Sequence, residues 1–128
     1  MPSESVARKQ IVVADDHPEI ADLLSELIAS FGYEVRTCYD GRQAQQAISE
    51  SWPHSAVLDI SMPNLNGCQV ARWARSQSDG ATIRLIALTG HGSSADHLTI
   101  RNAGFDEVLA KPLDFERLRA ALAAGEKA

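Results

Sequence analysis

The sequence has little cysteine, no long apolar run and no excess of positive charge, and each shortage excludes a class of protein. Cys38 and Cys68 are the only cysteines in 128 residues, and no CxxC pair is present. We therefore predict two reduced thiols rather than a disulfide scaffold or a cysteine-ligated metal centre. No apolar stretch approaches the ~20 residues of a membrane span, and the polar N-terminus lacks the features of a signal peptide. These observations predict a cytoplasmic protein without membrane contact.

The charge balance is acidic, with 17 Asp and Glu residues against 12 Lys and Arg residues and a net charge of -5. Such a chain offers no broad basic surface to a phosphate backbone, so we predict no direct nucleic-acid binding. A length of 128 residues suits one domain with its own core. We expect that domain to span residues 10–124, between an N-terminal tail of residues 1–9 and a C-terminal tail of residues 125–128.

Short apolar runs alternate with amphipathic segments along the whole chain. The expected strands are residues 10–16, 33–38, 54–59, 82–90 and 106–112. The expected helices are residues 18–31, 40–51, 68–78, 94–104 and 114–125. Helical spacing places apolar residues on the inward face of each helix, and those expected there include Ile20, Leu23, Leu98 and Phe115. Five strand–helix units in succession predict an α/β fold with a parallel sheet covered by helices on both faces.

Unusual polar residues fall where the predicted strands end. Asp15 and Asp16 follow the first strand, Asp59 ends the third, Thr89 lies at the end of the fourth, and Lys111 follows the fifth. Ligands of open α/β sheets bind beyond the carboxyl ends of the strands, so we expect these side chains to share one rim. A simpler alternative for Asp16 is that it caps the following helix.

Three carboxylates on one rim repel one another and need positive charge between them. Lys111 can neutralise one, and a hard divalent cation, by default Mg²⁺, suits oxygen ligands. A cation, an ammonium and a hydroxyl donor together can neutralise a phosphoryl group during transfer, and a carboxylate can accept that group as an aspartyl phosphate. His17 and His91 also fall near the rim; we interpret both as exposed loop residues rather than transition-metal ligands.

Four motifs follow one another at these strand ends. They are Asp15–Asp16, DISMPNLNG from Asp59 to Gly67, ALTG from Ala87 to Gly90, and Lys111–Pro112. In this order they resemble the response-regulator receiver domain of two-component signalling, of the chemotaxis-regulator type. The phrase AGFDEVLAKPLD is similar to receivers of hybrid histidine kinases. The resemblance implies a flavodoxin-like three-layer α/β/α sandwich with five parallel strands in the order 2-1-3-4-5.

The resemblance also implies a Mg²⁺ site on the rim. Asp16 would bind the ion directly and Asp15 mainly through water, while the phosphoacceptor Asp59 and the backbone carbonyl of Ser61 would complete the protein ligands. This ligand set consists of oxygen atoms alone, as Mg²⁺ prefers.

The same resemblance assigns the phosphoryl chemistry. Asp59 would accept the phosphoryl group, Thr89 would bond to one of its oxygens in the active state, and Lys111 would pair with it. The Lys111–Pro112 bond is often cis in this family. Where the family commonly carries Tyr or Phe, three residues before the lysine, this chain has Val108. We therefore expect a weaker or different conformational switch.

The implied donor is a histidine kinase or a histidine phosphotransfer protein, and the output is a downstream protein target. We expect a monomer or a weak phosphorylation-dependent dimer that supports its own Mg²⁺-dependent phosphorylation and dephosphorylation without a turnover substrate. A phosphorylation-independent interaction module of the same fold is the alternative. A Mg²⁺ phosphatase is disfavoured because Ser61 stands where its second aspartate belongs, and DDHPE lacks the character of a flavin phosphate loop.

Overall fold

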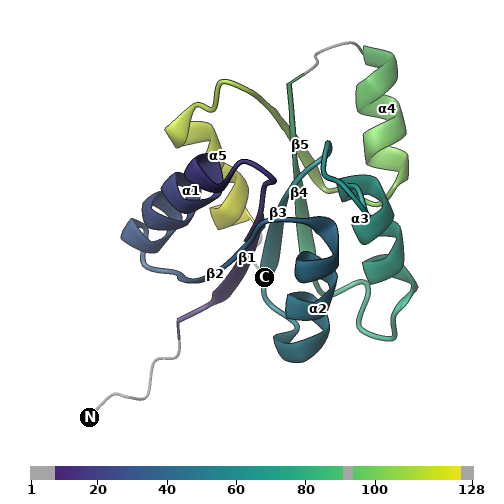
Figure 1. Cartoon of the computed structure of the whole chain (residues 1–128), viewed down its shortest axis with the longest axis horizontal. Helices are drawn as coiled ribbons and strands as arrows, with labels where there is room; N and C mark the ends of the chain where they lie inside the picture. Colours follow the sequence, from purple (N-terminus) through teal and green to yellow (C-terminus); the bar gives the residue numbers. More distant parts are fainter. Residues whose placement is uncertain (1–7, 91–93, 125–128) are drawn as a thin grey trace.

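The computed structural model describes residues 8–90 and 94–124, and ten helices and strands alternate along them (Figure 1). The strands are β1 (Gln10–Ala14), β2 (Glu34–Cys38), β3 (Ser55–Asp59), β4 (Arg84–Thr89) and β5 (Glu107–Ala110). The helices are α1 (Pro18–Ser30), α2 (Gly41–Ser51), α3 (Gly67–Ser76), α4 (Ser94–Asn102) and α5 (Phe115–Ala124). Every predicted element is present, and most differences at the ends are of one or two residues.

All five strands are parallel and lie in the order β2-β1-β3-β4-β5, which confirms the predicted topology. The register aligns the carboxyl ends of the central strands, since Ala14 of β1 pairs with Leu58 of β3 and Asp59 pairs with Leu88 of β4. Asp15 and Asp59 therefore leave neighbouring strands at the same level of the sheet. This alignment builds the rim that carries the polar side chains.

Alternating strand residues supply two separate hydrophobic cores. Val13 and Val57 face α1 and α5 in one core, whereas Ala56 and Leu58 face α2, α3 and α4 in the other. Figure 1 shows these two helical layers on opposite sides of the sheet. Because the central strands β1, β3 and β4 are buried on both faces, their sequences are almost continuously apolar, whereas the edge strand β2 alternates polar and apolar residues. Within the described ranges, no helix is both long and apolar enough to cross a membrane.

The loop after β3 is held close to the sheet. Its end is fixed by a capping box at the start of α3, in which Asn66 and Gln69 exchange side-chain-to-backbone hydrogen bonds. Gly67 follows, and a Cβ atom there would lie 2.5 Å from the backbone oxygen of Asp59. Glycine is required because the chain returns against the end of β3. The loop carrying Ser61 is thus held between the end of β3 and the capped start of α3.

The predicted inward faces of several helices are wrong at their margins. Leu23, Leu98 and Phe115 are 59%, 63% and 54% exposed, and Ile20 is 36% exposed. Helix α1 instead buries the narrower stripe of Ala21, Leu24 and Ile28. A helix that packs on one face of a sheet buries only the side chains pointing at the strands, so residues beside that stripe stay at the surface. The apolar spacing alone made the predicted faces too wide.

Candidate functional site

The strand ends bring together three of the predicted site residues. Lys111 Nζ lies 3.2 Å from Asp15 Oδ2 and 3.1 Å from Asp59 Oδ2, so one ammonium bridges two carboxylates. Lys111 follows β5 at the edge of the sheet, and its side chain reaches past the end of β4 to the acid that follows β1 and the acid that ends β3. The Lys111–Pro112 bond is cis, as the family resemblance implies.

The two carboxylates are almost completely removed from solvent. Asp15 is 0% exposed and Asp59 is 4% exposed. Burial raises the pKa of Asp59, and the charge of Asp15 raises it further, while the hydrogen bond from Ser61 and the Lys111 ammonium oppose the rise. For Lys111, burial lowers the pKa, but the hydrogen bonds and charges of Asp59 and Asp15 outweigh burial, so its pKa is raised overall. The ammonium therefore stays charged beside the acids.

Backbone amides of the two loops orient the carboxylates. Ser61 N–H donates to Asp59 Oδ1 over 3.0 Å, which leaves Oδ2 to face Lys111. His17 N–H donates in the same way to Asp15 Oδ1 over 2.9 Å. Each acid thus accepts from the residue two positions later and from the shared lysine. This arrangement fixes both side chains and directs them toward the same space.

Asp16 adds a third carboxylate with an unsatisfied oxygen. Its side chain is 31% exposed, but Oδ1 is buried and accepts no hydrogen bond from the described residues. Single ligand atoms of Asp15, Asp16, His17 and Asp59 all lie within 4.8 Å of one another. A buried oxygen without a donor carries a desolvation penalty that a cation would remove. The three carboxylates of this group fit an oxygen-ligated divalent cation.

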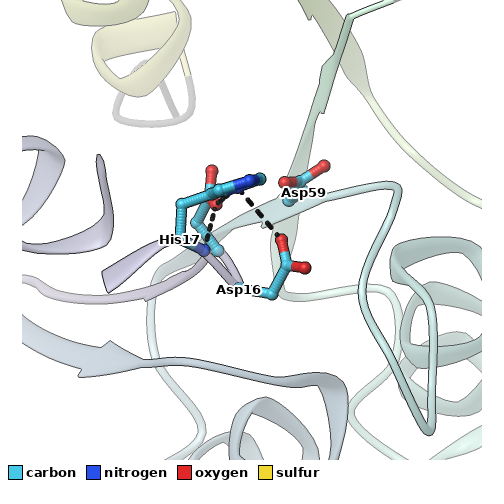
Figure 2. A group of neighbouring side chains, drawn as sticks. Asp16, His17 and Asp59 are labelled. Atoms are coloured by element: carbon cyan, nitrogen blue, oxygen red, sulfur yellow. Dashed lines mark hydrogen bonds and ion pairs between the residues drawn. The ribbon is translucent and has the colours of Figure 1, made fainter. Parts of the chain in front are cut away.

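Asp16 does not cap α1, which excludes the simpler alternative. The N-cap position of α1 is His17, and no side-chain hydrogen bond caps this helix. The carboxylate of Asp16 instead turns toward the ring of His17 and the space in front of Asp59 (Figure 2).

Thr89 and Ser61 lie on the same rim. Thr89 is 5% exposed at the end of β4, and its carbonyl accepts the backbone N–H of Lys111 over 2.8 Å, which joins the ends of β4 and β5. Ser61 is exposed in the loop after β3, where its amide holds Asp59. Its predicted role as a carbonyl ligand stays a prediction. His91 lies outside the described residues.

Two features of the site went unpredicted. His17 is exposed, as expected, but its Nδ1 lies 3.3 Å from Oδ1 of both Asp15 and Asp16. An apolar groove of about 250 Å³ also adjoins the rim. Its lining residues are Ile20, Leu23, Leu24, Lys111, Pro112, Leu113 and Phe115. The only signal for the groove in the sequence is the surplus of apolar residues at the margins of α1 and α5.

Residues 11–123 match the model of the response regulator receiver domain. Response regulator MprA of Mycolicibacterium vanbaalenii is 35% identical over 115 residues, which cover 90% of this chain and 49% of MprA. Transcriptional regulatory protein GltR of Pseudomonas aeruginosa is 32% identical over 116 residues, which cover 91% of this chain and 48% of GltR. The chain thus spans about half the length of these curated relatives.

Solved structures show the same architecture. The receiver domain of sensor histidine kinase PA1611 from Pseudomonas aeruginosa has a TM-score of 0.87 and 27% identity, covering 95% of this chain and 100% of that chain. That structure is described with a magnesium ion coordinated in the active site cleft. Chemotaxis protein CheY4 of Vibrio cholerae has a TM-score of 0.86 and 26% identity, covering 92% of this chain and 98% of that chain.

Proposed function

This chain belongs to the response regulator receiver domain family, and we propose that Asp59 is the residue that accepts its phosphoryl group. The position of Asp59 carries the proposal. Asp59 ends β3, the middle strand, so that Asp15, which follows β1, and Thr89, which ends β4, lie on either side of it. Lys111 reaches it from β5 over 3.1 Å.

In the proposed reaction an Asp59 carboxylate oxygen attacks the phosphorus atom of a phosphohistidine. The new O–P bond forms as the N–P bond breaks, and the electron pair of that bond stays on the imidazole nitrogen. Lys111 offsets negative charge on the phosphoryl oxygens, and the Thr89 hydroxyl donates to one of them. Because the accepting group is part of the protein, the chain acts as a phosphoacceptor without a turnover substrate.

Receiver domains bind Mg²⁺ in their acidic site, and the residues on this rim fit that ion. We assign the protein ligands to Asp15, Asp16, Asp59 and the Ser61 carbonyl. When bound, Mg²⁺ supplies positive charge against the phosphoryl oxygens. The buried Oδ1 of Asp16, which accepts no hydrogen bond from the described part of the chain, supports this assignment.

The apolar groove is the proposed docking site of a histidine kinase or a histidine phosphotransfer protein. Its lining includes Lys111, which also contacts Asp59, so one residue is shared by the groove and the proposed phosphoacceptor site. Leu23 and Phe115 expose apolar surface there that an amphipathic helix of the donor can cover. The donor helix would then present its phosphohistidine to the rim. We further propose that the phosphorylated domain, residues 10–124, passes the signal to a downstream protein. It would act as a monomer or as a weak phosphorylation-dependent dimer.

Acetyl phosphate tests the assignment of Asp59. Wild type, Asp59→Asn and Asp79→Asn are incubated with acetyl phosphate and Mg²⁺, and intact-mass spectrometry detects added phosphoryl groups. Asp79 is an exposed acid between α3 and β4, so its substitution is the matched control. We expect labelling of wild type and Asp79→Asn but not of Asp59→Asn. Equal labelling of all three proteins would refute the assignment, and an unlabelled wild type would favour a phosphorylation-independent interaction module.

A second experiment tests the docking groove. A phosphorylated histidine phosphotransfer domain that labels the wild type is mixed with Leu23→Asp or with Leu98→Asp. Leu98 is equally apolar and exposed, but it lies on α4 on the other side of the sheet. We expect Leu23→Asp to slow transfer about tenfold, equivalent to ~1.4 kcal/mol, while labelling by acetyl phosphate stays unchanged. Equal effects of the two substitutions would contradict docking in the groove.

A further inference from the structure

His17 places an imidazole nitrogen beside the acidic site. Its Nδ1 lies 3.3 Å from Asp15 Oδ1 and 3.3 Å from Asp16 Oδ1. Figure 2 shows the ring and the carboxylates of Asp16 and Asp59 turned toward a common space. The ring is 65% exposed, so packing does not force it into this position.

These distances match the spacing of atoms that bind one metal ion. Metal bonds of ~2.1 Å separate neighbouring ligand atoms by about 3.0 Å in octahedral geometry and about 3.4 Å in tetrahedral geometry. The 3.3 Å separations of His17 Nδ1 from the two carboxylate oxygens lie between these values. The buried Asp16 Oδ1 accepts no hydrogen bond within the described ranges, although the imidazole nitrogen lies this close to it. A shared cation would satisfy Asp16 Oδ1, and the imidazole nitrogen would ligate it in place of its 3.3 Å contact with Asp15 Oδ1.

We propose that His17 is an additional metal ligand that shifts the preference of the site from Mg²⁺ toward borderline divalent ions such as Mn²⁺, Co²⁺, Ni²⁺ and Zn²⁺. Mg²⁺ takes oxygen ligands, whereas imidazole nitrogen suits the later ions. The inference rests on the proposed metal site of Asp15, Asp16 and Asp59, and it replaces the interpretation of His17 as a plain loop residue. The receiver would thus bind these ions more tightly than three carboxylates alone allow.

The local backbone makes His17 a clean position for substitution. Its N–H, not its side chain, makes the 2.9 Å hydrogen bond that orients Asp15, so a variant keeps this contact. Pro18 begins α1 directly afterwards and fixes the chain on the other side. The ring can therefore be removed with little effect on the carboxylates.

Two roles for the ring predict different results. As a metal ligand, it strengthens Ni²⁺ binding and leaves Mg²⁺ binding nearly unchanged. As a hydrogen-bond partner of Asp15 alone, over 3.3 Å, it affects every divalent ion by a similar factor. The ratio of the Ni²⁺ and Mg²⁺ affinities separates these roles.

Calorimetric titration of tag-free, metal-free protein with Mg²⁺ and with Ni²⁺ provides the test, at one fixed pH. The proteins are wild type, His17→Ala and the control His54→Ala. His54 directly precedes β3, at the end of the strand opposite to Asp59. We expect His17→Ala to lower Ni²⁺ affinity by at least about 10- to 100-fold, because that range follows the loss of an outer partner and a lost ligand should cost no less. Mg²⁺ affinity should change by less than about twofold, and His54→Ala should match the wild type.

Pulsed electron paramagnetic resonance of the Mn²⁺-loaded protein gives an independent readout. A directly bound imidazole produces a nitrogen coupling, which we expect in wild type and not in His17→Ala. Unchanged Ni²⁺ affinity, equal changes for both ions, or no nitrogen coupling would overturn the role of His17 while leaving the Mg²⁺ site intact. Failure of the wild type to bind either ion would instead overturn the proposed metal site, and the inference with it.

Discussion

Lys111 is the main positive charge on the acidic rim, and its replacement by methionine tests how the fold tolerates buried acids. Methionine retains an unbranched apolar stem that can still line the groove beside Pro112 and Leu113. It removes the ammonium that lies 3.2 Å from Asp15 and 3.1 Å from Asp59. Two nearly buried carboxylates then face each other without this cation.

The expected loss of stability follows from these distances. At an effective dielectric constant of about 20, each contact is worth about 5 kcal/mol of Coulomb energy. Removing Lys111 also removes its desolvation penalty and releases its ordering entropy, which offset part of this sum. The lysine side chain is 25% exposed, so solvent screens part of the remainder. We expect Lys111→Met to lower the free energy of unfolding by about 3 kcal/mol in metal-free buffer, near the lower end for breaking a buried pair.

Mg²⁺ should reverse much of this loss, because a divalent cation replaces the missing charge. At a concentration one hundred times its dissociation constant, a ligand of the folded state adds about 2.7 kcal/mol. Without the competing ammonium, Lys111→Met should bind Mg²⁺ more tightly than wild type. At a fixed Mg²⁺ concentration it should therefore gain more stability, and the gap between the two proteins should narrow.

Urea unfolding with and without Mg²⁺ measures the effect. Trp52 and Trp73, whose rings lie 6.3 Å apart at the edge of one core, provide the fluorescence signal. Arg42→Met, which removes an exposed charge from α2, is the matched control. A metal-free Lys111→Met as stable as wild type, or a gap that Mg²⁺ leaves unchanged, would refute the charge-compensation argument.

Three further predictions concern pH, packing and switching. Burial and the Asp15 charge raise the pKa of Asp59 above 3.8 in the folded protein. The free energy of unfolding of the metal-free protein should therefore fall as the pH rises from 3.8 to the raised pKa. Urea unfolding should show this pH dependence in the wild type and its loss in Asp59→Asn. Arg75→Ala should lower the free energy of unfolding by about 3 kcal/mol in the same assay, because the guanidinium donates to three backbone carbonyls and to Asp106. Backbone NMR with beryllofluoride should show larger shifts near Ser61 than near Val108, whose burial gains less apolar area than that of an aromatic ring.

Much of the fold follows from hydrophobic periodicity, but the element ends depend on pairing partners. The first strand was predicted to continue to Asp16, yet β1 ends at Ala14. Ala14 still has neighbours in both β2 and β3, while the backbone N–H of Asp15 donates to the Cys38 carbonyl and the chain then turns away toward the rim. A sequence pattern does not show where a partner strand stops. The prediction that Leu23 and Phe115 face inward was wrong for a related reason, because the orientation of a helix on the sheet decides which of its apolar residues are covered.

The candidate site was predictable where it depended on topology. Parallel strands align their carboxyl ends, so a correct prediction of the strand order also places Asp15, Asp59 and Lys111 on the same rim. The contact of His17 with two carboxylates depends instead on loop geometry, since an extended backbone with φ -95° and ψ 106° sets where its ring starts. The groove was equally hidden, because α1 and the segment after β5 are distant in sequence and adjacent only in the fold.

Charged carboxylates buried beside the apolar cores are unfavourable, so we expect ligands that bring positive charge to the rim to stabilise the fold. The same burial that raises the pKa of Asp59 destabilises its charged form in the metal-free protein, and Lys111 compensates two carboxylates with one charge. A cation that binds the rim relieves a repulsion already present, so its binding free energy appears directly as added stability. Substituting one of these aspartates by asparagine should therefore raise the stability of the metal-free fold and lower the affinity for the metal ion. This is the trade-off expected where function requires unfavourable charge.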